Sequence, residues 1–419
     1  MLIYILFPFA VLIPGLLLCS KKAGNTGRAV YCAYFGALVC ALETLRFDVG
    51  TDYLAYKRIY EDMLWNPEWV HTSRLEKGYY VLQNILANRF YDYRIMFGVV
   101  AFIFAFAVAF WMYRYSSYPP LSGVGFVMYG IMFYSCNFLR QFFAAVIMLY
   151  AFEALKKKDL LRWVALVLFA ACFHWSALIM IPFFFIMHIR LQPVLLAVYG
   201  IAATFILVYS WNILGLIRDF YERFDMHSSY LYEQDMNVTK GISLFYFFGY
   251  ALLFIIAFMF RNKLYEKNKD NIIYMNCLLF VVLFDLWGCK HSIISRFDLF
   301  FVMPAILGLC PDIAECASEF ASEHIKQKYV AKGIACTALL CAATYFYGSM
   351  IAKNGNGCTP YFSWLQFAKV PESTISQIAE TEAPAETTVT DEDYDEDEAW
   401  EEENEEWIDD YWENEENWS

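Results

Sequence analysis

The chain has 419 residues, of which 59% are apolar and only 18% are charged. Long runs with almost no charge exclude a soluble globular protein of this size, because such runs are typical of helices that cross the hydrocarbon core of a bilayer. Because lipid satisfies no backbone hydrogen bonds, the composition predicts an all-α, polytopic integral membrane protein.

The formal charge of −13 comes from the C-terminal part of the chain. Residues 372–419 hold 21 acidic side chains and no Lys or Arg, whereas the rest of the chain holds 31 basic and 23 acidic side chains. Like charges at this density resist compaction, so we predict a disordered acidic tail over 372–419. A linker over 353–371 would join it to a membrane domain over 1–352. The tail is either a solvated appendage or a docking segment for a basic partner, with four tryptophans as anchors: Trp400, Trp407, Trp412 and Trp418.

The apolar runs predict about twelve transmembrane or half-membrane helices. In chain order the runs cover residues 2–19, 29–45, 95–113, 121–136, 141–155, 162–173, 175–187, 191–211, 242–260, 271–288, 297–310 and 330–352. The first run has no basic region before it, so we expect a retained span rather than a removed signal peptide.

Two apolar stretches are interrupted. Residues 121–155 would form about 52 Å of helix, which is too long for one crossing and predicts a break between Ser135 and Gln141. Residues 162–187 are interrupted at His174-Trp175-Ser176, which predicts two short half-spans. Residues 79–88 are too short to span and predict an amphipathic helix at the membrane surface.

Clusters of basic residues in short loops predict the orientation. With twelve crossings all three clusters fall on one face, which we assign to the cytoplasm. The polar stretches 46–94 and 212–241 then lie outside, and the unusual polar residues line a cavity open to the outer face. The clusters are Lys21, Lys22 and Arg28; Lys156, Lys157, Lys158 and Arg162; and Arg261, Lys263, Lys267 and Lys269.

Three arginines and a histidine stand out among the residues predicted to lie near the outer face. Arg46 follows an apolar run. It could bind a substrate, or it could simply anchor the end of a helix among lipid headgroups. Arg140 lies between two apolar runs, and a charge there usually faces a polar cavity or a partner. His174 could be functional or a packing histidine, and Arg296 could cap a cavity or anchor the chain at the interface.

Transfer of a sugar from a polyprenyl-diphosphate carrier is the chemistry that would use these residues. Diphosphate leaves as an anion, so Arg46, Arg140 and Arg296 are candidates for binding its oxygens. Asp52 and His174 are the candidates for the catalytic group that takes the proton from the incoming sugar hydroxyl.

Candidate sugar contacts lie close to these residues in the sequence. The rings of Tyr53 and Tyr56 could stack on sugar faces, and Glu76 and Gln141 are further candidates for binding the sugar. Gly50 would let the backbone approach the substrate closely.

Several other site chemistries have no motif in the chain. A phosphate-binding glycine-rich loop, H-E-x-x-H and G-x-S-x-G are all missing, which argues against a soluble activated sugar donor and zinc-protease chemistry. The twelve cysteines are scattered singly, without a C-x-x-C pair. They predict small buried side chains rather than metal ligands or disulfides.

The sequence Leu45-Arg46-x-x-x-Gly50-Thr51-Asp52-Tyr53-x-x-Tyr56 resembles the signature of the EpsG family of membrane proteins. That family resembles the Wzy-type polysaccharide polymerases, and the resemblance covers roughly residues 1–350. It implies an enzyme of the bacterial cytoplasmic membrane that polymerises exopolysaccharide repeat units on undecaprenyl diphosphate at the outer face, without metal or cofactor. Asp48 and the acidic tail lie outside the shared pattern. The further matching blocks are Glu76-x-Gly78-Tyr79, Arg140-Gln141, Phe173-His174-x-Ser176-Ala177-Leu178 and Ser295-Arg296.

Two other classes of function stay open at the level of sequence. A transporter or flippase of lipid-linked sugars would line a path through the whole membrane with polar residues, whereas here they gather near one predicted face. A membrane acyltransferase with His174 as base would need a tunnel from the cytoplasmic side, where no polar cluster suggests one. The expected partners are a lipid-linked oligosaccharide, the membrane and other polysaccharide-assembly proteins, and no nucleic acid is expected.

Overall fold

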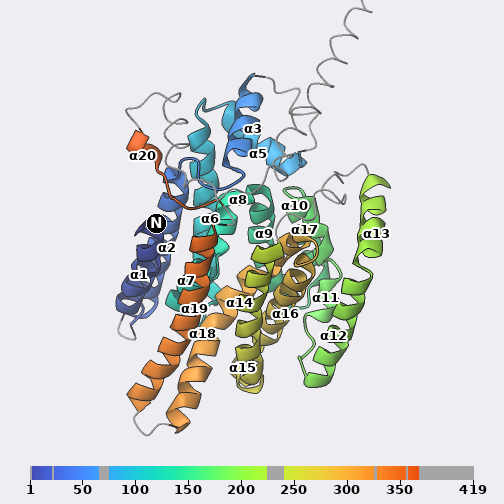
Figure 1. Ribbon diagram of the computed structural model, residues 1–419. Coiled ribbons are helices and arrows are strands. Elements are labelled where there is room, and N and C mark those ends of the chain that lie inside the picture. The colour runs from blue at the N-terminus through green and yellow to red at the C-terminus, as the bar shows by residue number, and fades with distance from the viewer. Residues whose placement is uncertain are drawn as a thin grey trace, which may run out of the picture. The chain divides into compact units, whose positions relative to one another are not determined.

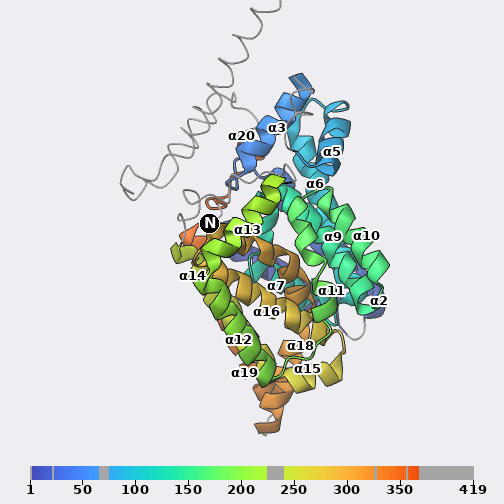
Figure 2. The same cartoon turned by 90° about the vertical axis from the view of Figure 1, so that its right-hand side faces the viewer.

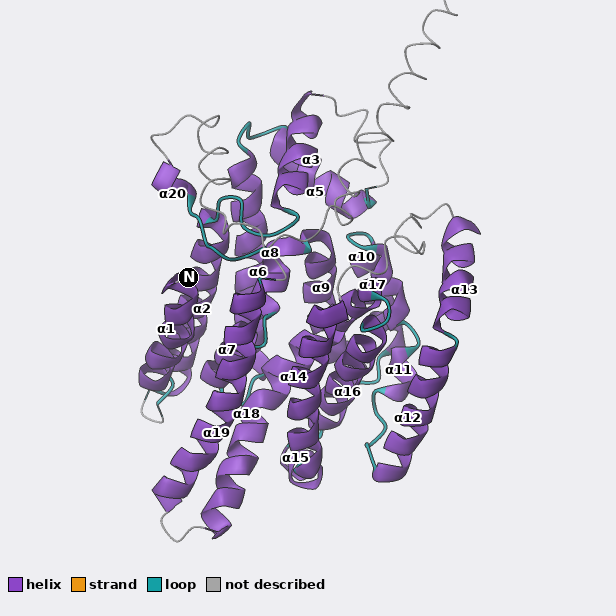
Figure 3. Ribbon diagram, viewed as in Figure 1, coloured by secondary structure: helices purple, strands orange, loops and turns teal. Residues whose placement is uncertain are grey.

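The structure is a computed structural model that describes residues 2–20, 23–65, 75–223, 240–324, 328–354 and 357–367. Over these ranges the chain is helical and has no strand beyond one isolated bridge between Arg46 and Ser363 (Figure 3). The predicted all-α class is therefore confirmed. The predicted acidic tail and the basic residues Lys21 and Lys22 lie outside the described residues.

The first half of the chain forms helices up to the break near His174. They are α1 (Leu2–Leu18), α2 (Gly24–Leu45), α3 (Tyr53–Trp65), α5 (Lys77–Ala87), α6 (Tyr93–Tyr115), α7 (Pro119–Met128), α8 (Ile131–Asn137), α9 (Leu139–Lys156) and α10 (Leu160–Ala171). The second half adds η1 (Trp175–Met180), α11 (Phe183–Ile186), α12 (Pro193–Val208), α13 (Ser210–Arg223), α14 (Lys240–Met259), α15 (Arg261–Lys267), α16 (Asn271–Gly288), α17 (Ser292–Ser295), η4 (Arg296–Asp298), α18 (Leu299–His324), α19 (Lys328–Lys353) and α20 (Trp364–Phe367).

The longer helices lie side by side and bury apolar faces against one another (Figures 1 and 2). Contacts join α2 to α6, α9 to α10, α16 to α18 and α18 to α19. The rings of Phe104 on α6 and Phe142 on α9, for example, pack edge to face with centroids 4.9 Å apart. Helix α12, in contrast, buries none of its residues and leaves apolar side chains such as Ile201 and Phe205 exposed. An apolar face without a protein partner is typical of a helix that contacts lipid.

Four helical segments of the described chain are long and apolar enough to cross a membrane, or up to six if each bent pair counts as one span. The prediction of about twelve crossings is therefore wrong. Several apolar runs form helices shorter than the roughly 20 residues that a crossing needs, with 17 residues in α1, 10 in α7 and 12 in α10. The four are α2, α6, α16 and the stretch Ile293–Ser322, and the bent pairs are Pro193–Val208 with Ser210–Leu216 and Leu244–Met259 with Arg261–Lys267.

The predicted interruptions are present. Between Ser135 and Gln141 the helix breaks at Phe138, whose ψ of 57° is not helical, and a second break lies at Gly130 with a φ of 76°. Helix α10 ends at Ala171, and His174 is extended before the short helix η1 begins. The predicted helix over 79–88 is α5. Helix α18 continues beyond the apolar run 297–310, as far as His324.

Helix α9 separates two groups of charged residues. Arg140 in its first turn and Lys156 in its last turn lie about 24 Å apart along the axis. The Lys156 ammonium contacts the Glu153 carboxylate at 2.7 Å, the Tyr274 hydroxyl at 2.7 Å and the Asp270 carboxylate at 3.3 Å. Arg140 therefore begins the helix at the end opposite to this ion-pair network.

Basic residues from the other predicted loops lie beside Lys156. Its ammonium also sits 5.1 Å from the ring centroid of Tyr115, at the end of α6. In the same turn of α6, the Arg28 guanidinium donates to the carbonyl of Tyr113 at 2.7 Å. Lys267 pairs with Asp312 at 3.5 Å, and Asp312 accepts a hydrogen bond from Ser117 just beyond α6. We call this region, around Arg28, Lys156 and Lys267, the basic end.

Residues 357–367, here called the strap, return from α19 to the end of α2. The Phe47 N–H donates to the Phe362 carbonyl and the Gly50 N–H to the Gly357 carbonyl, both at 2.9 Å. The Tyr361 hydroxyl donates to the Leu42 carbonyl at 2.7 Å. This part of the segment expected to be a linker is thus fastened along the motif that the sequence singled out.

Candidate functional site

The loop of residues 46–52, here called the motif loop, begins where α2 ends at Leu45. Its backbone takes left-handed conformations at Asp48, with a φ of 48°, and at Gly50, with a φ of 103°. A Cβ on Gly50 would lie 2.7 Å from the Asn137 Oδ1 atom and 3.0 Å from the Cys136 carbonyl oxygen. Only glycine fits both constraints, so Gly50 allows the loop to pack against the end of α8.

Arg46 is buried beneath the motif loop. Its guanidinium donates to the carbonyl of Val49 at 3.1 Å and to the carbonyl of Cys136. It also lies over the rings of Phe97 and Tyr53, at 4.9 and 5.7 Å from their centroids. With these partners, Arg46 holds the loop to α8 and α6, a position that differs from the open anion-binding role we expected for it.

The two tyrosines expected to stack on sugar are buried as well. One ring face of Tyr53 is covered by Phe97, in a parallel stack with centroids 4.6 Å apart. Tyr56 packs edge to face on Tyr79, and its hydroxyl accepts a hydrogen bond from the Arg140 backbone N–H at 3.5 Å. Both rings support the start of α3 and leave no open face for a sugar in this structure.

Glu76 reaches the site because α5 starts in close contact with the end of α10. The Gly78 N–H donates to the Cys172 carbonyl at 2.7 Å, and a Cβ on Gly78 would lie 2.6 Å from that carbonyl oxygen. The missing side chain at position 78 therefore permits the approach. On the other side, Phe173 stacks on Phe143 of α9 with centroids 4.3 Å apart. These contacts bring Glu76, His174 and the first turn of α9 together.

The Glu76 carboxylate uses both of its oxygens. Oε2 accepts a hydrogen bond from the Arg140 guanidinium at 2.7 Å, and Oε1 lies 2.8 Å from the Nδ1 atom of His174. An ionised carboxylate only accepts hydrogen bonds, so the proton on this pair belongs to His174 Nδ1. That fixes the ring so that Nε2 is the histidine nitrogen left for other chemistry.

The electrostatic state of Glu76 follows from its surroundings. Burial raises its pKa, but the hydrogen bond from His174 and the charge of Arg140 outweigh burial and lower the pKa of Glu76 from its ordinary 4.5 to about 2. Glu76 is therefore a carboxylate at any physiological pH. It forms the centre of an ion pair with Arg140 and a hydrogen-bonded pair with His174.

Asp52 and Arg296 complete the group that the structure brings together. Burial raises the pKa of Asp52, while the charges of Arg296, Arg140 and Arg46 act on its carboxylate in the opposite direction. Arg296 is exposed, with its guanidinium over the Phe138 ring at 5.0 Å.

Gln141 lies beside Arg296 rather than in an open position of its own. Its side-chain amide donates to the Arg296 carbonyl at 2.6 Å, so it is engaged with protein backbone. We call Asp52, Tyr56, Glu76, Arg140, Gln141, His174 and Arg296 the polar cluster.

Sequence reasoning missed three buried carboxylates near the polar cluster. Glu43 on α2 accepts a hydrogen bond from a serine of α8. Asp298 follows Arg296 by two residues and accepts a hydrogen bond from Tyr134. Asp285 on α16 lies close enough to Asp298 for their charges to interact. An acidic residue inside an apolar run, as at Glu43 and Asp285, is the sequence signal that could have found them.

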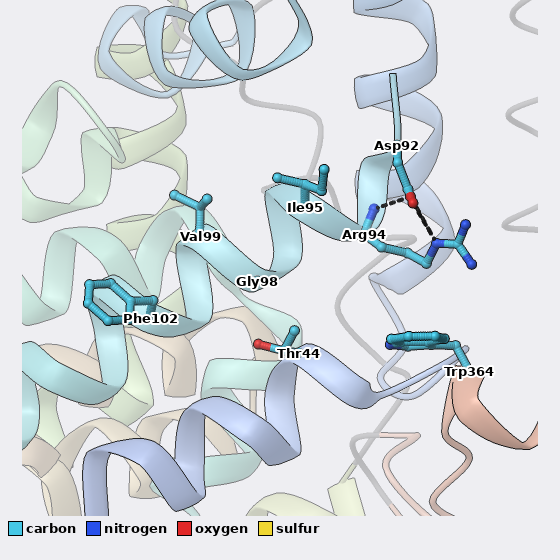
Figure 4. A pocket seen from close by; sticks show the side chains of 8 residues that line it. All are labelled: Thr44, Asp92, Arg94, Ile95, Gly98, Val99, Phe102 and Trp364. Atoms are coloured by element: carbon cyan, nitrogen blue, oxygen red, sulfur yellow. Dashed lines mark hydrogen bonds and ion pairs between the residues drawn. The ribbon is translucent and has the colours of Figure 1, made fainter. Parts of the chain in front are cut away.

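The two cavities described in the structure lie away from the polar cluster. The larger has a volume of about 520 Å³ and opens between α2, α6 and the strap (Figure 4). Arg94 lies at its edge, paired with Asp92 at 2.9 Å and 5.7 Å from the ring centroid of Trp364. The second, of about 280 Å³, is lined by α14 and α19. Within the described ranges, no three His, Cys, Asp or Glu side chains are grouped as a metal site would need.

Comparison with known proteins gives one match. The model of the EpsG family matches residues 29–363, a range that holds the motif loop, all seven residues of the polar cluster and most of the strap. No curated protein matches the chain. No solved structure matches it either. Because the family model covers most of the chain, the protein belongs to the EpsG family, whose members are membrane proteins of polysaccharide biosynthesis.

Proposed function

We propose that the protein polymerises exopolysaccharide repeat units by glycosyl transfer from a polyprenyl-diphosphate-linked oligosaccharide. Membership of the EpsG family supports a role in polysaccharide biosynthesis. The observation that carries the reaction type is the polar cluster, in which two arginines, two carboxylates and a histidine from remote parts of the chain meet. This set of groups is what transfer from an anionic leaving group requires.

The leaving diphosphate binds to Arg140 and Arg296 in this proposal. The Arg140 guanidinium gives one donor to Glu76, and the side chain is 28% exposed, so part of it can meet a ligand. Arg296 is exposed beside it, and both charges act on Asp52. Guanidinium groups fork onto phosphate oxygens, and their effect is largest where charge develops in the transition state. Arg46, being buried, takes the role of holding the motif loop.

His174 removes the proton from the incoming sugar hydroxyl. Glu76 accepts the Nδ1 proton and so orients the ring with Nε2 as the basic nitrogen. A carboxylate behind a histidine also stabilises the imidazolium that forms when the base takes up a proton. Asp52 remains the second candidate for this proton, and in either role it lies beside the two arginines that bind the leaving group.

The reaction takes place at the outer face of the bacterial cytoplasmic membrane. Support comes from the charge distribution, because the basic end lies at the opposite end of α9 from Arg140. Short basic loops are retained on the cytoplasmic side of membrane proteins. The polar cluster then meets lipid-linked repeat units after they have been moved across the membrane.

The test is the length of polymer made by cells that carry Arg140→Ala or His174→Ala. We expect chain extension to fall at least about 100-fold, in line with the loss of one preorganised donor at a developing charge. Single lipid-linked repeat units should accumulate on the outer face. Arg140→Lys, which keeps the charge beside Glu76 but not the fork, should recover only part of the activity.

Arg94→Ala is the matched control. Arg94 also pairs with a carboxylate, that of Asp92, but it lies at the edge of the larger cavity and not in the polar cluster. Its variant should make polymer of normal length. Full-length polymer from Arg140→Ala protein that is present in the membrane would refute the proposal. Accumulation of repeat units on the cytoplasmic face instead would identify a flippase.

A further inference from the structure

Two cysteines that are far apart in the sequence meet behind the motif loop. Cys136 lies in α8, and Cys358 lies in the strap. The two cysteines are free thiols within hydrogen-bonding reach of each other, and each side chain is only 2% exposed. The Asn137 side-chain amide also lies 3.7 Å from the Cys358 sulfur. Neither cysteine has another close to it along the chain, so the spacing of the cysteines did not predict this pair.

The neighbourhood of the pair is held in place by hydrogen bonds to the backbone. The Tyr4 hydroxyl donates to the Cys358 carbonyl at 2.6 Å, and the Arg46 guanidinium donates to the Cys136 carbonyl. The Gly357 carbonyl, one residue before Cys358, accepts the hydrogen bond from the Gly50 N–H. Both cysteines therefore lie against the motif loop, Cys136 through Arg46 and Cys358 through its neighbour Gly357.

We propose that Cys136 and Cys358 are a disulfide site that joins the strap to α8. The inference rests on the proposed function in one respect, which is that this end of the molecule faces the outside. Disulfides form and persist in extracytoplasmic compartments, whereas thiols in the cytoplasm are kept reduced. A bond here would lock the strap across the motif loop that carries Asp52.

The bond forms by exchange with the disulfide of an extracytoplasmic thiol oxidase. The thiolate of one cysteine attacks the oxidase disulfide, which releases one oxidase thiol and leaves a mixed disulfide. The thiolate of the other cysteine then displaces the second oxidase thiol. The two cysteines give up two electrons and two protons, and the oxidase disulfide becomes two thiols. Because both sulfurs are buried in the folded chain, the exchange precedes the packing of the strap onto α8.

The experiment counts thiols on the full-length protein in membranes. The sample is denatured with and without a reductant and treated with a maleimide polymer that slows migration in a gel by one step per thiol. The chain has twelve cysteines. Wild-type protein should show two fewer reactive thiols without reductant than with it. C136S and C358S should each show equal numbers in the two conditions.

C40S is the matched control, since Cys40 is a partly buried cysteine whose sulfur contacts Thr44. It should keep the difference of two. Digestion without reductant should yield one linked peptide pair that contains Cys136 and Cys358. Equal thiol numbers in wild-type protein, or a link between other cysteines, would overturn the inference. The count needs no activity, so polymer made by a protein with free thiols would refute the disulfide and leave the proposed function standing.

Discussion

At the scale of single residues, Glu76 decides how the site is arranged. We expected it to contact sugar, but its side chain is 5% exposed and both oxygens are occupied by Arg140 and His174. A carboxylate between a guanidinium and an imidazole fixes the position of both. In the proposed reaction Glu76 is thus a positioning residue, and the groups that would meet a substrate are the exposed part of Arg140 and the Nε2 atom of His174.

The lowered pKa of Glu76 makes a testable contribution to stability. A carboxyl group whose pKa falls from 4.5 to about 2 on folding stabilises the fold at pH above 4.5. That contribution is lost as the pH falls from about 4.5 to about 2. Its upper limit is roughly 3 kcal/mol. The apparent melting temperature of Glu76→Gln protein in detergent should therefore lie well below that of wild type at pH 7, and the gap should shrink at pH 3.

Glu315→Gln provides the comparison, because Glu315 also pairs with a basic residue, Lys267, but is 58% exposed. Exposed ion pairs contribute little, so its melting temperature should follow wild type at both pH values. A gap between Glu76→Gln and wild type that is equal at pH 7 and pH 3 would contradict the assignment of the ionised Glu76 pair.

At the scale of helices, the site is built from helix ends and breaks. Arg140 follows the break at Phe138, His174 follows the end of α10, Arg296 follows α17, and the motif loop follows α2. A break in a helix at membrane depth frees backbone groups and is tolerated where protein or water satisfies them. The breaks therefore bring polar backbone groups and charged side chains from several helix ends to one place.

The junction between α5 and α10 gives the prediction at this scale. In Gly78→Ala protein the new Cβ would meet the Cys172 carbonyl oxygen at 2.6 Å, so α5 must move away from α10. We expect a loss of stability of roughly 1–3 kcal/mol together with loss of chain extension, because Glu76 moves with α5. Gly200→Ala on α12, where no atom lies within 4 Å of the new Cβ, should be neutral in both measurements. Normal polymer from Gly78→Ala protein would show that the contact does not set the site.

The helices and their breaks could be read from the sequence, and the contacts between them could not. The length of run 121–155 required a break, and the break is present at Phe138. Nothing in the spacing showed that Tyr53 stacks on Phe97 or that Cys358 returns to Cys136, since both depend on tertiary packing. The predicted number of crossings was wrong for the same reason, because the length of an apolar run does not show whether a short helix crosses the membrane.

At the scale of the whole molecule, two groups of charged residues lie at opposite ends of helix α9. The basic end holds Arg28, Lys156 and Lys267. Arg140 of the polar cluster lies in the first turn of α9, at the other end of that helix. The sequence predicted from twelve crossings that three basic clusters share one membrane face. Arg28, Lys156 and Lys267 lie around one end of α9, and the membrane face on which they lie stays a prediction. The separation along α9 depends on which residues begin and end that helix. The number of crossings does not change it.

The orientation that follows is tested with single cysteines. Cys172 is exposed beside the polar cluster, where its carbonyl accepts the hydrogen bond from Gly78, and Lys157 is exposed at the basic end. In right-side-out membrane vesicles, a maleimide that cannot cross the membrane should label wild-type protein at Cys172. Cys172→Ser protein should lose this label, and adding Lys157→Cys to it should restore labelling only after the vesicles are opened. The reverse pattern would put the polar cluster on the cytoplasmic side and contradict the proposed reaction at the outer face.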